Sequence, residues 1–343
     1  MKIVVLAGGT STERDISIIT SANVCKSLRR NGHKANMLDV FYGIEDSKIK
    51  GFFEEDNDLD EVASELKAKT KGVAQELENR KNNKKGFFGN GVLELCQEAD
   101  IVFMGLHGCN GEDGKIQATF DLLNIKYTGT GYLSSAISMS KELTKKVLTL
   151  DGVPMPKGIS LQKGHKIEYV PFPCVVKPCC GGSSVGVSIV HNEEEFKKAV
   201  DLAFSYEDTI LVEEFIDGRE FSVAVLDGKA LPVVEIEPVE GFYNYENKYK
   251  AGATIETCPA NIPEDVSDKM KRWAEKACEA AGVHTYARVD EFLSKDGDIY
   301  CIEINTLPGM TPTSLIPQEA QAVGMSYDML TEKIIEISME KYK

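Results

Sequence analysis

The sequence predicts an α/β protein with two or three domains, in which an open sheet comes first and antiparallel hairpins follow. Its 343 residues are enough to give that number of domains well-developed cores. Residues 2–7 (KIVVLA) form an apolar run of strand length, followed by a glycine turn and a helix-like segment that ends at Gly32. Strand, glycine turn and helix begin an open α/β sheet, in which ligands gather beyond the strand ends.

A second buried strand is expected over residues 101–108 (IVFMGLHG), and it also leads into a polar glycine turn. Because both turns belong to one sheet, we expect them to face one pocket. The glycines after the first strand match neither the GxGxxG pattern nor the Walker A loop, which weakens the case for a nicotinamide-dependent oxidoreductase. Residues 45–85 are dense in Asp, Glu and Lys and are expected to be exposed helix and loop.

From about residue 130 the pattern changes. One helix is predicted over residues 134–152, with Lys141 and Lys145 four residues apart on one face. Strand-like segments at residues 172–178 and 185–190 flank CCGGSS and predict a hairpin with a Gly-Ser tip. The segments that follow are predicted to be a helix near 193–204, strands at ILVEEF and EFSVAVLDG, a lid loop over 241–252, and an amphipathic helix between Pro263 and Gly282.

Residues 288–305 are predicted to form the last hairpin. Asp296-Gly297 lies between two alternating apolar runs, which is typical of a tight two-residue turn. With that turn, Asp290 lies opposite Glu303. Side chains on a strand repeat every second residue, so both carboxylates project from the same face.

The same register places Arg288 opposite Asn305 on that face. Directly opposed like charges repel, and a divalent cation between Asp290 and Glu303 would remove the repulsion. Oxygen ligands without a neighbouring His or Cys suit Mg²⁺ or Mn²⁺ better than zinc. The alternative is the polar face of a solvated hairpin in a slipped register.

Composition excludes several classes of partner. The chain has 39 Lys plus Arg against 54 Asp plus Glu, and the net charge of -15 disfavours nucleic acid and anionic membranes. The first apolar run is too short for a signal peptide and no run approaches membrane-spanning length, so we expect a cytoplasmic protein. The nine cysteines include no CxxC pair, which fits reduced thiols rather than a disulfide framework.

Four polar residues adjoin predicted buried strands and have both a structural and a functional interpretation. Lys177 precedes the Gly-Ser tip, where it either extends to solvent or meets phosphate oxygens wrapped by the loop. Glu213 and Glu214 end the strand ILVEE, and because adjacent strand residues point to opposite faces, at most one is expected to face a given pocket. His107 alone is more simply explained as a structural histidine.

Seven segments, taken together and in this order, resemble the D-alanine-D-alanine ligases of the ATP-grasp superfamily. They are GGTSTERDIS, HGCNGEDGKIQ, MSKELTK, FPCVVKPCCGGSSVG, YENKY, ARVDEFL and IEINTLPGMTPTSLIP. The resemblance extends from residue 3 to about residue 335 and is weakest over 42–90. It implies three α/β domains: a substrate-binding domain with an open parallel sheet (1–129), and two antiparallel-sheet domains (130–213 and 214–343) that hold ATP between them.

The resemblance implies an ATP-dependent enzyme that makes D-alanyl-D-alanine for peptidoglycan precursors, with ATP and two Mg²⁺ (or Mn²⁺) as cofactors. It also implies a homodimer. The γ-phosphate of ATP would convert the first D-alanine's carboxylate to an acyl phosphate, which the second amine attacks as phosphate leaves. The alternatives are a relative that uses D-serine or D-lactate as second substrate, and a catalytically silent nucleotide-binding protein.

The resemblance assigns nucleotide and metal roles to residues in the second half of the chain. The expected phosphate contacts are three lysines: Lys141, Lys177 and Lys248. Glu213 and Glu220 would hold the nucleoside, and Glu214 stands near the adenine where relatives often have lysine. The expected metal ligands are Asp290, Glu303 and Asn305, with Glu303 bridging the two ions.

Amino-acid binding is assigned in the same way. Glu13 would bind the ammonium of the first D-alanine, with Ser183 and Tyr249 hydrogen-bonded to it and His107 near the carboxylate. Arg288 and the backbone N–H of Gly309 would stabilise the oxyanion. Ser314 would bind the second carboxylate, with Leu315 packing beside it. Leu315 and Tyr249 favour D-alanine, since D-serine and D-lactate enzymes tend to carry a basic residue or a lid histidine there.

Overall fold

The computed structural model describes residues 1–165, 171–182, 184–239 and 252–343, which form two compact units. Unit 1 comprises Met1–Ser135, His284–Ala287 and Thr306–Lys343. Unit 2 comprises Ala136–Val283 and Arg288–Asn305. No helix within these described residues is long and apolar enough to cross a membrane.

Unit 1 contains the predicted open parallel sheet, whose strands are β1 (Lys2–Ala7), β2 (Lys34–Asp39) and β3 (Ile101–Met104). The strand order is β2-β1-β3, and both pairings are parallel. Parallel neighbours need a crossover, and α1 (Arg14–Arg30) supplies it between β1 and β2. The strands are almost wholly buried, as expected when helices cover a parallel sheet.

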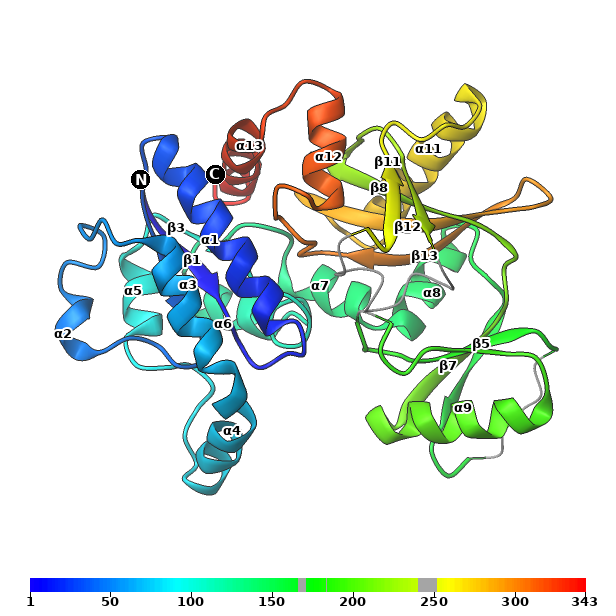
Figure 1. The fold of residues 1–343 in the computed structure, drawn as a ribbon, viewed down its shortest axis with the longest axis horizontal. Helices are drawn as coiled ribbons and strands as arrows, with labels where there is room; N and C mark the ends of the chain where they lie inside the picture. Colours follow the sequence, from blue (N-terminus) through cyan, green and yellow to red (C-terminus); the bar gives the residue numbers. More distant parts are fainter. Residues whose placement is uncertain (166–170, 183, 240–251) are drawn as a thin grey trace. The chain divides into compact units, whose positions relative to one another are not determined.

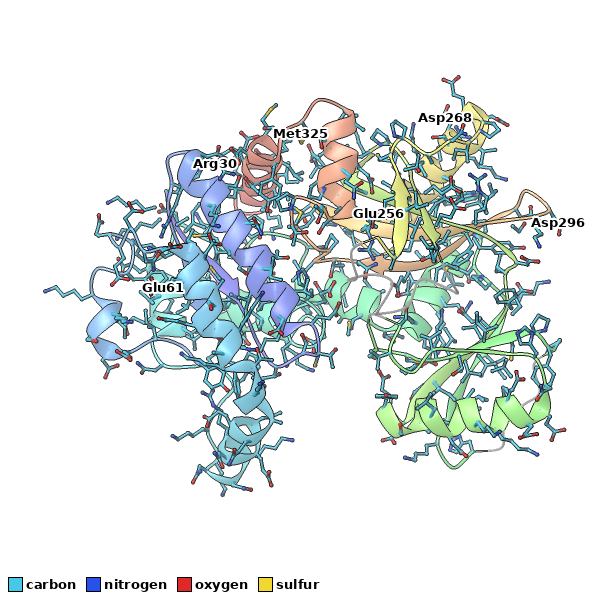
Figure 2. The ribbon with its side chains drawn as sticks, in the orientation of Figure 1. Arg30, Glu61, Glu256, Asp268, Asp296 and Met325 are labelled. Atoms are coloured by element: carbon cyan, nitrogen blue, oxygen red, sulfur yellow. The ribbon has the colours of Figure 1, made fainter. Side chains whose placement is uncertain are left out.

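The charged 45–85 region belongs to unit 1 and consists mostly of exposed helix and loop, as predicted. There α3 (Leu59–Ala68) buries only Leu59, Ala63 and Leu66, and Glu61 on the same helix is exposed (Figure 2). α1 and α13 (Tyr327–Glu340) lie side by side, joined by the Arg30–Asp328 ion pair of 2.6 Å (Figure 1). The remaining helices are α2 (Asp46–Ile49), α4 (Val73–Asn82), α5 (Val92–Glu98), α6 (Lys115–Leu122) and α12 (Leu315–Ala322). α7 (Tyr132–Met139) begins in unit 1 and ends in unit 2.

Unit 2 contains two sheets. The smaller has the order β4-β7-β5-β6, with antiparallel pairings between β4 (Gly158–Gln162), β7 (Thr209–Glu214), β5 (Cys174–Pro178) and β6 (Ser188–Val190). α9 (Glu193–Tyr206) packs on it through Phe196 and Ala203. The larger sheet has the order β11-β10-β8-β12-β13 and is covered by α11 (Glu264–Ala280) (Figure 1). Its strands are β8 (Gly218–Leu226), β9 (Lys229–Ala230), β10 (Val234–Pro238), β11 (Thr254–Thr257), β12 (Tyr286–Ser294) and β13 (Ile299–Asn305).

The β12–β13 hairpin has the predicted pairing but not the predicted turn. Asp290 pairs with Glu303 and Arg288 with Asn305, as expected. The connection is a three-residue loop, because the Ser294 N–H donates to the Asp298 carbonyl at 2.8 Å. Gly297 has φ +87 in this loop, a conformation that glycine adopts without strain. Asp296 lies at the hairpin tip (Figure 2).

A register shift between Asp290 and Glu291 restores the predicted pairing. From the loop up to Glu291 the strands pair one residue out of the expected register, with Glu291 opposite Cys301. Ile302 is the extra residue on β13, which is the arrangement of a β-bulge. The longer loop and the bulge therefore cancel, and Asp290 lies opposite Glu303 as predicted.

Two further predictions concern the helix before the small sheet and the lid loop after β10. The single helix expected over 134–152 is wrong: the chain forms α7 and α8 (Lys141–Leu150), separated at Ser140, whose hydroxyl caps α8 by accepting the Leu143 N–H. Lys141 and Lys145 still lie on one helix, four residues apart. The predicted lid over 241–252 lies outside the described residues except for Gly252.

Candidate functional site

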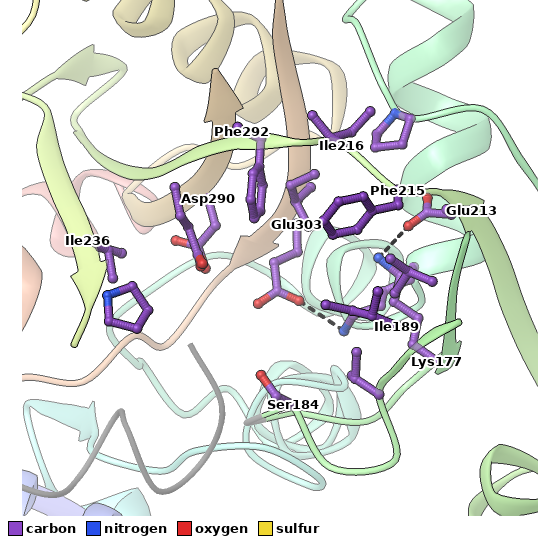
Figure 3. A pocket seen from close by; sticks show the side chains of 18 of the residues that line it. Lys177, Ser184, Ile189, Glu213, Phe215, Ile216, Ile236, Asp290, Phe292 and Glu303 are labelled. Carbon is purple, nitrogen blue, oxygen red and sulfur yellow. Dashed lines mark ion pairs between the residues drawn. The ribbon is translucent and has the colours of Figure 1, made fainter. Parts of the chain in front are cut away.

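A cavity of about 680 Å³ lies within unit 2, lined by strands of both of its sheets (Figure 3). Its apolar lining is contributed by Val175, Ile189, Phe215, Ile216, Ile236, Phe292 and Ile302. Its ionisable lining comprises three cationic side chains (Lys141, Lys177 and Arg219) and eight acidic ones (Glu213, Glu214, Asp217, Glu220, Glu235, Glu237, Asp290 and Glu303). A concave, partly apolar cavity with placed polar groups is typical of a site for a small molecule.

A buried ion cluster lies at one end of this cavity. Glu213 is 4% exposed, and its two carboxylate oxygens contact the ammonium groups of Lys177 at 2.5 Å and Lys145 at 2.7 Å. Burial raises the pKa of Glu213, but the charges of Lys177 and Lys145 outweigh burial, and the net pKa lies below its usual value. Glu213 is therefore ionised, and Lys177 is held at the cavity wall rather than extended to solvent (Figure 3).

A second ion pair joins α8 to the hairpin. Lys141, the first residue of α8, contacts Glu303 at 3.0 Å and donates to the Gly181 carbonyl at 2.8 Å. Burial lowers the pKa of Lys141, and the attraction of Glu303 more than reverses this, so its pKa is raised. Lys141 thus stays charged next to the Gly-Ser tip.

Cationic side chains balance the negative charges of Asp290 and Glu303, the two carboxylates among the predicted metal ligands. Arg288 donates to both oxygens of Asp290, at 2.8 and 2.7 Å, and Asn305 donates to the same carboxylate at 3.1 Å. Lys141 compensates Glu303. The expected repulsion is therefore relieved without a metal, so repulsion alone does not support a metal site. Across the described parts of the chain, no three His, Cys, Asp or Glu side chains converge to hold a cation.

The Gly-Ser tip between β5 and β6 borders the cavity through Gly181, Gly182 and Ser184. It is tied to α8 because the Lys141 N–H donates to the Cys179 carbonyl at 2.9 Å. The Cys180 N–H donates to the Glu207 carboxylate at 3.0 and 2.9 Å. The tip therefore lies next to Lys141 at the cavity wall.

Glu214 and Glu220, which the resemblance places near the nucleoside, are among the acidic residues that line the cavity. The prediction that only one of Glu213 and Glu214 faces a given pocket is wrong, because Glu214 is the last residue of β7 and the cavity wraps around that strand end. Its carboxylate accepts the Lys157 N–H at 2.8 Å, whereas Glu213 contacts the lysines. The two neighbours thus face different groups, as strand alternation requires.

In unit 1, the glycine turns after β1 and β3 lie next to each other, as predicted. The Ser11 hydroxyl donates to the His107 carbonyl at 2.7 Å. Gly108 is so close to Glu13 that a Cβ atom added there would lie 3.0 Å from the Glu13 Oε2 atom. The His107 ring is 5% exposed and lies between the Thr20 hydroxyl (3.1 Å) and the Leu307 carbonyl (2.7 Å). These contacts give His107 a structural role in unit 1.

Ser314 and Leu315 lie at the start of α12, and Gly309 lies in the segment that leads into it. The Ser314 hydroxyl accepts the Thr311 N–H at 3.0 Å, and a Cβ atom added at Gly309 would lie 3.0 Å from the Ser314 Oγ atom. Leu315 is 4% exposed, so it is part of the core of unit 1. The expectation that Leu315 offers apolar surface to a substrate side chain finds no support in this burial.

Three predicted residues, Ser183, Lys248 and Tyr249, lie outside the described residues. The sequence interpretation placed Lys145 on one helix face with Lys141 but gave it no role, and it did not identify Ile302. Lys145 had a signal, its position one helical turn after Lys141, but nothing local linked it to Glu213. Ile302 had none, because a bulge on β13 brings it to the cavity.

Comparisons with known proteins give a consistent result along the chain. The family described as "D-ala D-ala ligase N-terminus" matches residues 2–130, and "D-ala D-ala ligase C-terminus" matches residues 156–336. The D-alanine--D-alanine ligase of Pediococcus pentosaceus is 43% identical over 342 residues, covering 98% of this chain and 97% of that protein. The enzyme of the same name from Lacticaseibacillus casei is 40% identical, covering 100% and 97%.

Solved structures agree with the sequence relatives. The crystal structure of a D-alanine--D-alanine ligase from Bacillus anthracis has a TM-score of 0.78 at 31% identity, covering 99% of this chain and 98% of that one. The same protein complexed with ATP has a TM-score of 0.75 at 29% identity, covering 99% and 98%.

Proposed function

Because the chain belongs to the D-alanine-D-alanine ligase family, we propose that it joins two molecules of D-alanine, converting ATP to ADP and phosphate. The product would serve peptidoglycan precursors. The observation that carries the proposal is the cavity of unit 2, in which an apolar hollow ends at the buried Lys177–Glu213–Lys145 cluster and the Lys141–Glu303 pair. This arrangement suits a nucleoside at the apolar wall and phosphates at the lysines.

The chemistry proposed for the cavity is phosphoryl transfer to a carboxylate. A carboxylate oxygen of the first D-alanine attacks the γ-phosphorus of ATP, and ADP leaves. The second amine then attacks the carbonyl carbon of the acyl phosphate, and phosphate leaves with the bridging oxygen. Positioning and charge neutralisation dominate such transfers, so the charges of Lys141 and Lys177 are the main contribution of the described residues. Lys248 is proposed as a third phosphate contact from the sequence.

The donor set on the hairpin fits Mg²⁺ or Mn²⁺. Asp290, Glu303 and Asn305 offer only oxygen ligands from one face, and they would hold two ions that neutralise phosphate charge. The contacts to Arg288 and Lys141 hold the two carboxylates in place on this face of the hairpin. Arg288 would then turn its remaining donors to the oxyanion of the second step.

Unit 1 is proposed to supply the amino-acid contacts. Glu13, beside Gly108, would bind the ammonium of the first D-alanine. Ser314 directly precedes α12, whose first N–H groups favour a carboxylate, so the second substrate's carboxylate is assigned there. The role of His107 would be indirect, through its contacts with Thr20 and Leu307. The homodimer and the cytoplasmic location stay predictions.

Phosphate release with ATP and Mg²⁺, measured with and without D-alanine, tests the proposal. A true ligase releases phosphate only when D-alanine is present, and mass spectrometry then finds D-alanyl-D-alanine. A mixture of D-alanine, D-serine and D-lactate at equal concentrations tests the second substrate, and D-alanyl-D-alanine should predominate. Nucleotide binding without D-alanine-dependent phosphate release would identify a catalytically silent relative instead.

A further inference from the structure

Lys145 is half-buried, lies outside the cavity lining and has no role in the reaction proposed above. Its ammonium contacts the Glu213 Oε1 atom at 2.7 Å and donates to the Pro156 carbonyl. Pro156, Glu213 and Lys177 all line the cavity, but Lys145 does not. Lys145 therefore reaches a bound ligand only through the residues that it contacts.

The cluster contains two ammonium groups and one carboxylate, and it is buried. The Glu213 Oε1 atom faces Lys145 and the Oε2 atom faces Lys177. The side chains of the two lysines are 14% and 8% exposed, and that of Glu213 is 5% exposed. The cluster therefore carries one positive charge more than its carboxylate balances, and a ligand phosphate that contacts Lys177 would offset it.

A buried carboxylate that loses all of its partners is strongly unfavourable, whereas one that keeps a cationic partner is not. If Lys177 were the only partner of Glu213, a phosphate would have to compete with Glu213 for the Lys177 ammonium. Lys145 removes this conflict, because Glu213 keeps one ion pair when Lys177 turns to the ligand.

We propose that Lys145 is a positioning residue for nucleotide binding, which holds Glu213 from outside the cavity so that Lys177 exchanges that carboxylate for a nucleotide phosphate. The inference rests on the proposed use of ATP in this cavity. It adds a residue that acts without touching ATP.

Lys145→Met tests the inference, with Lys145→Arg as the conservative variant. Loss of the charge should raise the Kd and the KM for ATP roughly 10- to 100-fold, because the phosphate then competes with a buried carboxylate for Lys177. The KM for D-alanine should stay near the wild-type value. Lys145→Arg keeps a cation beside Glu213 and should recover most of the ATP affinity. Lys146→Met is the matched control, since Lys146 is the next residue on α8, is 62% exposed and pairs with Glu142.

A second substitution separates positioning from general structural support. In a Glu213→Gln background there is no carboxylate for Lys145 to hold, so adding Lys145→Met should change the Kd for ATP less than about twofold. A structural role would instead lower ATP binding equally in both backgrounds. Lys145→Gln, which keeps a donor for Pro156 without the charge, should show the same loss as Lys145→Met and replaces it if that variant does not fold.

Calorimetric titration with ATP and Mg²⁺, combined with thermal unfolding, gives the required readouts. Failure of the wild-type protein to bind ATP would overturn the proposed function itself. Binding by the wild type with an unchanged Kd in a folded Lys145→Met or Lys145→Gln variant would overturn only the role of Lys145. An equal loss of affinity in the wild-type background and in the Glu213→Gln background would overturn it as well.

Discussion

Glu291 is buried in unit 2 on the face of β12 that points away from the cavity, and its replacement is expected to stabilise the protein. Its neighbours Asp290 and Phe292 line the cavity, so strand alternation turns Glu291 to the other face. The side chain is 0% exposed, and neither carboxyl oxygen has a hydrogen-bond partner among the described residues. Burial, and then the charge of Asp290, raise the pKa of Glu291 well above its usual value.

The stabilisation expected from replacing Glu291 is the sum of two free-energy costs that the wild-type side chain imposes. A buried polar group without a partner costs about 1–3 kcal/mol, and methionine has similar length without that demand. The folded protein also holds the Glu291 proton after the unfolded chain has released it. The wild-type free energy of unfolding therefore falls as pH rises above about 4.3, by about 1.4 kcal/mol per pH unit, until the raised pKa is reached.

These costs predict an order of stability at pH 7. Glu291→Gln removes the proton uptake but keeps an unpartnered polar group, so it should be more stable than the wild type. Glu291→Met removes both costs and should exceed Glu291→Gln by about 1–3 kcal/mol, or roughly 2–12 °C in unfolding midpoint for a unit of this size. Calorimetry and urea unfolding of the three proteins measure the order. A Met variant less stable than the Gln variant would refute the reasoning, because it would mean that the carboxyl group has a partner.

Three further predictions concern the reaction site and the thiols. Glu303→Gln should nearly abolish turnover while the fold is kept, because it removes the carboxylate, next to Lys141, that is proposed to bridge the two cations, and near-normal activity at any Mg²⁺ concentration would end the metal assignment. Ser314→Ala should raise the KM for the second D-alanine roughly tenfold, about 1.4 kcal/mol, with an unchanged KM for ATP, and equal rises in both constants would argue against a specific carboxylate contact. The exposed Cys109 and Cys180 should react with maleimide before Cys278, because burial raises the pKa of the Cys278 thiol to about 12, and peptide mapping that finds Cys278 labelled first would contradict this burial.

Local sequence signals were sufficient where neighbours in the chain decide the structure. The first strand, glycine turn and helix follow from an apolar run and glycines, and the pairing of Asp290 with Glu303 follows from alternation about Asp296-Gly297. That pairing was reached through a wrong turn length, since the three-residue loop shifts the register by one residue and the bulge at Ile302 shifts it back. Bulges depend on packing and twist, which alternation does not encode.

Contacts between distant segments could not be predicted from the pattern. Lys145 and Glu213 are far apart in the sequence, and only the fold brings α8 to the end of β7. The burial of Leu315 likewise depends on what packs against α12, and the sequence shows only that an apolar residue follows a helix cap. The neutralisation of Asp290 by Arg288 follows from the sequence, because residues two apart on a strand share a face, but the pattern does not show that Arg288 rather than a metal balances this carboxylate.

Activation of a carboxylate by ATP is the central claim, and transfer of a labelled carboxylate oxygen to phosphate tests it most directly. D-Alanine labelled with ¹⁸O in its carboxylate is incubated with the protein, ATP and Mg²⁺, and the released phosphate is analysed by mass spectrometry. An acyl phosphate leaves with the bridging oxygen, so the phosphate should carry one ¹⁸O atom for each D-alanyl-D-alanine formed from labelled acid. Formation of the dipeptide with unlabelled phosphate would contradict the acyl-phosphate route.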